Sequence, residues 1–337
     1  MCSVGSRRSK NLIICLVLIS SLSFVFLSQG AIASNPEEIS DWHGLNDMRN
    51  DLSGDYVLVN DLDETTEGYD DHASETANGG DGWEPIGDSD NPFTGTFDGD
   101  GYEIKDLTID RLDVDYIGLF GYLDSSTIQN VGMVNVDIFG EIRVGGLSGR
   151  TSEDCTVSNT YSTGVVKGKG FDHDGDKTTT TGGLVGVNSG DISNSYSASS
   201  VDGHIEVGGL VGRNNGEVTD SFSTGEVSGN DEVGGLVGRN NGEVTDSFST
   251  GEVSGDDEVG GLVGSVGDAS YVDNSYWNTE TSGTDTSDGG EGRTTAEMTW
   301  EYSTDTYVDW NFDNIWLDGD HGLIPEGQYP ALQWQWD

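Results

Sequence analysis

Three aspartates at alternate positions form the one local pattern in this chain that is typical of a metal site. They are Asp172, Asp174 and Asp176, and they share a short loop with Gly175. Alternating carboxylates in a glycine-containing loop gather the oxygen ligands that calcium prefers, so the pattern predicts calcium as the candidate cofactor. Two details depart from a calcium loop, because Gly175 comes early and no glutamate closes the loop at the usual distance. A solvated acidic loop without metal is the alternative.

The residues that carry the common hydrolytic mechanisms do not occur at the required spacings. A zinc peptidase needs His-Glu-x-x-His, and none of the histidines is arranged in that way. No Gly-x-Ser-x-Gly motif and no phosphate-binding loop occurs in a strand-to-helix context. The sequence therefore predicts no catalytic residues and a protein that is not an enzyme. The five histidines are His43, His72, His173, His204 and His321.

A carbohydrate-active enzyme is the enzymatic alternative, either a polysaccharide lyase or a glycoside hydrolase. A hydrolase needs two carboxylates, but with 61 Asp and Glu in 337 residues a pair of acids carries no information. A lyase would also need a base, whereas the repeats contain only Arg213 and Arg239 as basic candidates.

The elements that would position any site come from one repeated unit. Residues 206–229 recur without change as residues 232–255, and looser copies lie on both sides. Versions of V-G-G-L-V-G begin at Tyr116, Val144, Thr181, Val207, Val233 and Val259, at steps of 28, 37, 26, 26 and 26 residues. The long step contains an insertion around residues 171–180. Such a period indicates a solenoid, in which each unit buries its apolar face against the next.

Each unit is rich in Gly, Ser, Thr and Val and has short alternating runs, which favour strands over helices. Glycine-rich corners divide a unit into about three short strands. We therefore expect an all-β fold, a parallel β-helix of about six coils with an N-terminal and a C-terminal cap. A leucine column and an aromatic column are both expected in the core, and a column of Asn and Asp is expected to satisfy backbone donors at a corner. The leucines are Leu119, Leu147, Leu184, Leu210, Leu236 and Leu262; the aromatics are Tyr161, Tyr196, Phe222, Phe248 and Tyr276; the third column is Asn130, Asn159, Asn194, Asp220, Asp246 and Asn274.

The two ends of the chain differ from the repeats, and we expect four segments. Residues 1–33 have basic residues, an apolar stretch and a small-residue cleavage site, as in a secretory signal peptide, with both general and twin-arginine export open. A membrane anchor is the alternative. Residues 34–115 form the leader and N-terminal cap, residues 116–274 the β-solenoid repeats, and residues 275–337 the Trp-rich C-terminal cap. The tryptophans of that cap can fill its interior or form a sugar-stacking platform, and we expect the first. Removal of the signal leaves Cys155 alone, and we expect it to be a small buried hydrophobic residue.

Acidic residues are spread over the whole chain. The mature protein keeps 11 Lys and Arg against 61 Asp and Glu, a formal charge of −50. Nucleic acid is thereby excluded as a partner, because its phosphates would be repelled. Regular apolar columns argue against disorder, so the charge indicates a halophilic source, where a Debye length of about 3 Å at 1 M salt screens the repulsion. The fold is then expected to loosen at low salt.

Two signatures, V-G-G-L-V-G and N-S-Y-S, resemble the GLUG-motif repeat family of secreted and surface proteins. The resemblance extends to the leader, in Trp83-Glu84-Pro85-Ile86-Gly87, and to the tail, in Tyr276-Trp277-Asn278 and Tyr329-Pro330-Ala331-Leu332. It implies a location outside the cell or on its surface. Related repeats occur in bacterial adhesins, in surface proteins of salt-loving archaea and beside the zinc peptidase of immunoglobulin A-cleaving enzymes. The peptidase activity does not transfer, because its zinc motif does not occur in this sequence.

Repetition without a unique polar cluster, together with export, predicts a secreted, non-catalytic repeat protein with an adhesin-like or structural role. Its expected partner is a component of the cell surface, of the extracellular matrix or of a polysaccharide. Contact with the membrane is expected only through the export signal.

Overall fold

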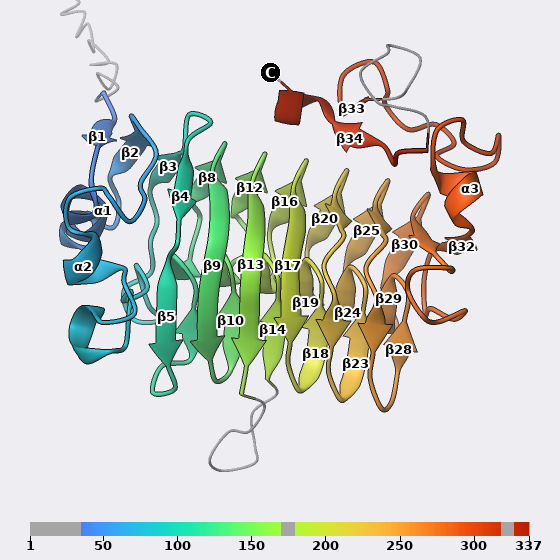
Figure 1. Cartoon of the computed structure of the whole chain (residues 1–337), viewed down its shortest axis with the longest axis horizontal. Coiled ribbons are helices and arrows are strands. Elements are labelled where there is room, and N and C mark those ends of the chain that lie inside the picture. Colours follow the sequence, from blue (N-terminus) through green and yellow to red (C-terminus); the bar gives the residue numbers. More distant parts are fainter. Residues whose placement is uncertain (1–34, 170–178, 318–326, 337) are drawn as a thin grey trace, which may run out of the picture. The chain divides into compact units, whose positions relative to one another are not determined.

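The structure is a computed structural model that describes residues 35–169, 179–317 and 327–336. In this part of the chain, six successive coils form a parallel β-helix, and the fold predicted from the repeats is confirmed (Figure 1). Every coil contributes to four parallel sheets, so a coil has four strand positions and the prediction of about three was wrong. The reason is that the V-G-G-L-V-G motif makes two strands that meet at a glycine-leucine corner.

The first and second sheets have six strands each, one from every coil. The first sheet consists of β6 (Tyr116–Ile117), β10 (Arg143–Gly145), β14 (Thr180–Gly182), β18 (Ile205–Gly208), β23 (Asp231–Gly234) and β28 (Val259–Gly260). The second sheet consists of β7 (Phe120–Leu123), β11 (Ser148–Thr151), β15 (Val185–Asn188), β19 (Val211–Asn214), β24 (Val237–Asn240) and β29 (Val263–Val266).

The third and fourth sheets also include strands from the segments that flank the coils. The third sheet consists of β1 (Glu37–Ile39), β2 (Asp55–Leu58), β3 (Thr96–Asp98), β8 (Thr127–Gln129), β12 (Thr156–Ser158), β16 (Asp191–Ser193), β20 (Glu217–Thr219), β25 (Glu243–Thr245) and β30 (Tyr271–Asp273). The fourth consists of β4 (Glu103–Lys105), β5 (Thr108–Arg111), β9 (Gly132–Gly140), β13 (Tyr161–Gly168), β17 (Tyr196–Asp202), β21 (Phe222–Ser223), β22 (Val227–Ser228), β26 (Phe248–Ser249), β27 (Val253–Ser254), β31 (Tyr276–Asn278) and β32 (Glu291–Arg293).

Strand register aligns the duplicated units residue by residue, as in the pairs Val211–Val237 and Arg213–Arg239. The first coil departs from the predicted alignment. Ile117, rather than Tyr116, pairs with Val144, because the corner before Leu119 is one residue shorter than the corner before Leu147. Tyr116 therefore aligns with Arg143.

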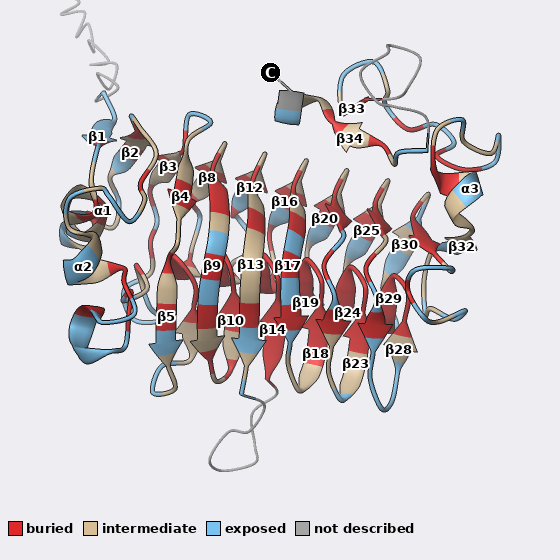
Figure 2. Cartoon of the chain, viewed as in Figure 1, coloured by how far each residue is buried: buried red, intermediate tan, exposed pale blue. Residues whose placement is uncertain are grey.

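The leucine column fills the interior, and all six leucines are 0% exposed. Burial of each such side chain is worth about 1.5–3 kcal/mol, so the repeated leucine is the main apolar contribution of every coil. The red segments of the strands in Figure 2 mark this buried side. Cys155 is buried as well.

The Asn and Asp column occupies the corner between the third and fourth sheets. All six residues have positive φ, between 44° and 55°, a left-handed conformation that Asn and Asp tolerate better than most residues. The side chains bond to one another more than to the backbone, as in Asn159 Nδ2 to Asn130 Oδ1 at 2.9 Å. The column was predicted to satisfy backbone donors; its backbone conformation is the more direct reason for these residue types.

A second asparagine column is buried inside the solenoid and was not predicted. Asn188, Asn214 and Asn240 are 0% exposed. Each of the first two donates from Nδ2 to Oδ1 of the next, at 2.9 Å in both cases. They also bond to backbone groups of the following turn, including Gly216 N to Asn214 Oδ1 at 3.2 Å. This amide ladder provides hydrogen-bond partners for backbone groups at the corner between the second and third sheets.

The aromatic column is stacked as expected, but it lies outside the solenoid. Tyr196 and Phe222 have centroids 4.8 Å apart, and Phe222 and Phe248 lie 5.0 Å apart. The inward positions of these strands belong to serines, such as Ser197 and Ser223, which are 0% exposed. Strand alternation therefore turns the rings away from the interior of the solenoid. Burial in a core is confirmed for Phe222, Phe248 and Tyr276, but this core is a second cluster on the outside of the fourth sheet.

The segment after the last coil returns along the side of the solenoid and covers these rings. It contains α3 (Thr295–Met298), β33 (Trp316–Leu317), β34 (Ala331–Leu332) and η4 (Gln333–Trp336), with β33 antiparallel to β34. Trp316 is 0% exposed and packs on Phe248 at 5.8 Å. Trp334 Nε1 donates to Asn194 O of the third coil at 2.9 Å. We call residues 295–336 the return segment, within the described ranges; Figure 1 shows β33 and β34 above the coils.

Segments outside the six coils form hydrogen bonds with the strands at each end of the solenoid. Before the first coil lie α1 (Trp42–Asp47), η1 (Met48–Asn50), α2 (Tyr69–His72) and η2 (Ala77–Gly79). Bridges from Ile86 to Phe120 and from Phe93 to Leu123 extend the second sheet on that side. Behind the last coil, Gly261 N donates to Thr286 O at 2.9 Å. This pairing covers part of the strand edges at both ends of the solenoid, and exposed edges would promote aggregation.

Candidate binding surface

The predicted calcium ligands Asp172, Asp174 and Asp176 lie outside the described residues, so the calcium site stays a prediction. Among the residues that the structure does describe, no group of three or more His, Cys, Asp or Glu is arranged to hold a metal ion. The chemistry of the described surface therefore has to come from other side chains.

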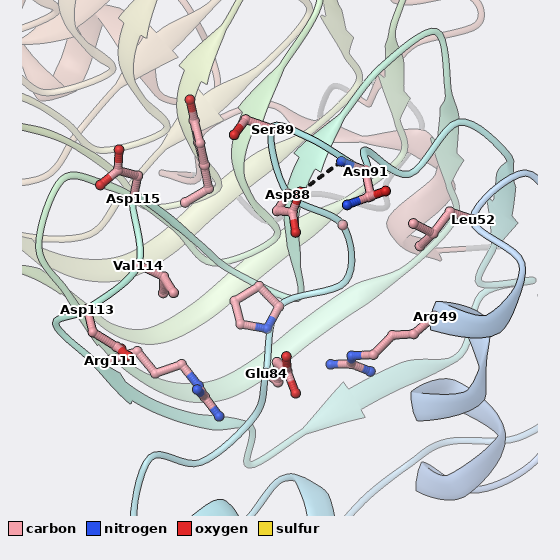
Figure 3. Close-up of a pocket in the computed structure, with 13 residues that line it drawn as sticks. Arg49, Leu52, Glu84, Asp88, Ser89, Asn91, Arg111, Asp113, Val114 and Asp115 are labelled. Carbon is pink, nitrogen blue, oxygen red and sulfur yellow. Dashed lines mark hydrogen bonds between the residues drawn. The ribbon is translucent and has the colours of Figure 1, made fainter.

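A pocket of about 590 Å³ opens where the leader meets the first coil (Figure 3). Its walls come from η1, from the loop before β3 and from the turn between β5 and β6. Two arginines, Arg49 and Arg111, line it together with acids that include Glu84 and Asp113. In Figure 3 the carboxylate of Glu84 and the guanidinium of Arg49 point toward one another. The pocket thus combines cationic donors with carboxylate acceptors.

Trp83 holds both arginines of the pocket. The guanidinium of Arg49 lies over the Trp83 ring at 4.5 Å, and Arg111 Nε donates to Trp83 O at 3.0 Å. The indole in turn donates from Nε1 to Leu119 O at 3.0 Å. Trp83 is 0% exposed, so it fixes the leader and its two cations to the first leucine corner.

Arg49 is only partly satisfied by its neighbours. Nη1 donates to Asn46 O and Oδ1 at 3.1 and 3.0 Å, whereas Nε and Nη2 are buried without a hydrogen-bond partner among the described residues. Burial lowers the pKa of Arg49 to about 10; Glu84 opposes that shift and Arg111 adds to it. Arg49 remains charged at neutral pH, and its charge is incompletely compensated.

Tyr116 lines the same pocket and begins a band of aromatic and basic side chains on the outside of the first two sheets. Its ring stacks on Tyr122, with centroids 5.6 Å apart and planes at 16°. Arg143 lies over the Tyr116 ring at 5.1 Å, and Arg150 over the Tyr122 ring at 5.5 Å. All four side chains are half-buried. We call Tyr116, Tyr122, Arg143 and Arg150 the Tyr-Arg face.

Later coils place an ion pair at the equivalent position. Arg213 follows Arg150 in the column of the second sheet, and its Nε donates to Glu206 Oε1 at 2.9 Å. Arg239 and Glu232 repeat the pair in the next coil. In the second coil, Arg143 stands where these glutamates would be. Two arginines therefore replace one arginine and one glutamate, and the second coil gains positive charge.

Glu206 is the most buried of these glutamates, at 2% exposed. Burial raises its pKa to about 7, although the bond to Arg213 opposes the shift. Its second carboxylate oxygen has no partner among the described residues. We attribute the raised pKa to this desolvated oxygen.

Two tryptophans of the return segment, Trp310 and Trp316, are not available as an open platform for sugars. Trp310 and Trp316 are buried, at 6% and 0% exposed, and both indoles donate to the solenoid. The packing role that the sequence favoured is therefore confirmed for these two residues. The location was wrong, because they cover the side of the solenoid and not only its end.

The cysteine and two of the histidines considered in the sequence analysis contact neighbouring side chains. Cys155 Sγ lies 3.4 Å from Ser152 Oγ and 3.5 Å from Ser126 Oγ. His43 Nδ1 and His72 Nε2 form a hydrogen bond of 3.0 Å in the leader. The sequence analysis did not predict the arginines of the pocket or the Tyr-Arg face. The signal that could have indicated the Tyr-Arg face is Arg143, which occupies the position that is glutamate in later repeats.

No helix within the described ranges is both long enough and apolar enough to span a membrane.

Comparison with known proteins identifies the repeat. The model of the GLUG motif matches residues 203–228 and 229–254. The chain is 34% identical over 174 residues to halomucin of Haloquadratum walsbyi, an alignment that covers 50% of this chain and 2% of halomucin. It is 39% identical over 114 residues to a protein of Evansella cellulosilytica with the provisional name Gly-rich membrane protein, covering 33% of this chain and 12% of that protein. The chain thus corresponds to a small part of each relative.

Among solved structures, the chain resembles a crystal structure from Bacteroides ovatus that has the provisional name immunoglobulin A1 protease. The TM-score is 0.64 at 23% identity, over 90% of this chain and 93% of the other. At this identity the likeness concerns the fold alone.

Proposed function

We propose that this GLUG-repeat β-helix is a secreted, non-catalytic protein of a halophile that presents a regular face for adhesion or for a structural contact at the cell surface. Its partner is a polysaccharide or another component of the surface or extracellular matrix. The observation that carries the proposal is the register of the coils, which places equivalent side chains in columns. A catalytic site needs a unique cluster, whereas columns of equivalent groups suit a repeating polymer.

Salt adaptation is supported by the outer face of the third sheet. Asp191 pairs with Glu217 and Glu217 with Glu243, so three acids stand directly above one another. Burial raises the pKa of Glu217, and the neighbouring Asp191 and Glu243 add to the shift. Such a column repels itself at low ionic strength and is tolerated where salt screens it. The names of the two relatives, a halomucin and a Gly-rich membrane protein, agree with a role at the cell envelope.

A carbohydrate-active enzyme is the second candidate, because the pocket holds Glu84 beside Arg49 in a concave site. One experiment separates the two. The exported chain is incubated with isolated cell envelopes and with a polysaccharide array in about 2 M salt, and bound protein and released sugars are both measured. Binding without new reducing ends or unsaturated sugars is the expected result. Release of product that Glu84→Gln abolishes would replace the adhesin proposal by the enzyme.

A further inference from the structure

We infer that the pocket and the Tyr-Arg face together bind an acidic polysaccharide, a polymer of sugars that bear carboxylate or sulfate groups. This inference rests on the proposed function and names the partner chemistry of the same surface. It depends on three observations: the concentration of cations, the acids placed among them, and the way the tyrosine rings are covered.

The concentration of cations stands out against the rest of the chain. The protein has 14 Lys and Arg against 61 Asp and Glu. Four of the arginines nevertheless belong to one continuous region, because Tyr116 lines the pocket of Arg49 and Arg111 and also contacts Arg143, while Arg150 contacts Tyr122. Guanidinium groups bind carboxylates and sulfates with paired, charge-assisted hydrogen bonds. At about 1 M salt, distant acids are screened within about 3 Å, and such direct contacts decide the affinity.

The acids among these arginines select against a purely anionic ligand. Four acids line the pocket beside the two guanidinium groups: Glu84, Asp88, Asp113 and Asp115. Carboxylates accept hydrogen bonds from hydroxyl groups and repel anionic groups of every kind, so a ligand that bears only anionic groups fits the pocket poorly. A sugar that has both hydroxyl groups and an anionic group can satisfy both kinds of side chain in the pocket.

The tyrosines of the Tyr-Arg face offer their edges and hydroxyl groups. Arg143 lies over the Tyr116 ring and Arg150 over the Tyr122 ring, and the two rings stack on each other. A nucleic acid base, which binds a single tyrosine by stacking on a free ring face, would compete with these contacts. Phenol hydroxyls can instead exchange hydrogen bonds with sugar hydroxyls.

The test uses the full exported chain in about 1 M salt with four immobilised probes: polygalacturonate, dextran sulfate, unmodified dextran and polyglutamate. The first variant is Arg143→Thr with Arg150→Val, which copies Thr180 and Val187 of the third coil, the residues that align with these arginines. The second is Arg143→Glu, which copies the ion pair of the later coils. The control is Lys167→Gln with Lys169→Gln. It removes two exposed positive charges, one in β13 of the fourth sheet and one directly after it.

We expect the wild type and the control to bind polygalacturonate or dextran sulfate but not dextran, with dissociation constants within about twofold of each other. Both Arg143 variants should bind at least roughly tenfold more weakly, the loss of one good charge-assisted contact, while their melting temperatures stay near that of the wild type. Equal binding by the Arg143 variants and the control overturns the inference, as does preferential binding of polyglutamate. If cell envelopes are bound but neither acidic polysaccharide is, the inference fails and the proposed function stands; release of sugar products would instead remove the proposed function.

Discussion

Trp316 donates a hydrogen bond from its indole Nε1 to Oδ1 of Asp220 at 3.0 Å, although 96 positions separate the two residues in sequence. Asp220 belongs to the left-handed corner of the fourth coil, and Trp316 belongs to the return segment. The bond therefore ties the end of the chain to the middle of the solenoid.

Replacement of Trp316 by Ala should detach the return segment from the aromatic column. The side chain is fully buried against Phe222 and Phe248. Its loss is expected to reduce the free energy of unfolding by about 3–5 kcal/mol, measured by urea denaturation. Trp300→Ala, at a half-buried position, is the control and should cost clearly less. Equal losses in the two variants would mean that the return segment does not depend on this contact.

Leu210→Ala should leave a cavity at a corner of the interior and cost about 2–5 kcal/mol of unfolding free energy. Leu236→Ala should cost the same, because the two leucines lie in identical units and are both 0% exposed. Val266→Ala, at a residue that is 37% exposed, should change the stability by less than about 0.5 kcal/mol. A Leu210 variant as stable as the Val266 variant would contradict the core assigned to this column.

Asn214→Ala should interrupt the buried amide ladder in its middle. The change removes a hydrogen bond to each neighbouring asparagine and leaves buried polar groups unpaired. We expect a loss of about 1–3 kcal/mol in thermal or urea unfolding. The neighbouring Asn215 is exposed, and Asn215→Ala serves as the matched control. Equal melting temperatures of the two variants would show that the ladder does not contribute to stability.

Asp246 should make the protein less stable as the pH rises. Burial and the adjacent Asp220 raise its pKa from 3.8 to about 6. Because the folded state holds the proton more tightly than the unfolded state, the unfolding free energy falls between about pH 4 and pH 6 and stays low above that range. Asp246→Asn copies the asparagines of the other coils and should gain about 1 kcal/mol at pH 7.5, after allowance for solvent screening, and almost nothing at pH 3.

Melting curves from pH 3 to pH 8 would check this prediction, with Asp154→Asn in the exposed turn between β11 and β12 as control. A gain for Asp246→Asn of the same size at both extremes of pH would argue against a raised pKa.

Calcium should stabilise the chain if Asp172, Asp174 and Asp176 bind it. We expect the melting temperature to rise on titration with calcium and to fall again with a chelator, because a ligand that binds the folded state alone stabilises it. Replacement of all three aspartates by asparagine should abolish both changes. Identical calcium responses of the wild type and the variant would remove the site.

The sequence predicted the elements whose position depends on period alone. Leu210 and Leu236 recur at the same place in identical units, so their burial follows from stacking. The period alone does not predict which face of a strand points inward, because Phe222 and Ser223 alternate and either could do so. We expected the larger side chain inside, but the narrow interior beside the fourth sheet takes serine, and Ser249 Oγ donates to Gly261 O there at 2.5 Å.

The pocket and the Tyr-Arg face could not be predicted from the sequence for a related reason. Arg49 and Arg111 come together only because Trp83 packs between the leader and Leu119, and no local pattern records that contact. The alignment of Tyr116 with Val144 also hid the pairing of Tyr116 with Arg143. A one-residue deletion at a corner shifts the outward-facing assignments of the strand before it, here β6, while β7 stays in register.

The return segment also constrains how the number of repeats can change in evolution. Gain or loss of a 26-residue unit, such as the one that recurs in residues 206–229 and 232–255, would lengthen or shorten the solenoid by one rung. Trp334, however, reaches back to Asn194 across a fixed number of rungs. The repeated units lie between Asn194 and Trp334 in the sequence, so each gain or loss of a unit changes the distance that the return segment must span to keep this contact.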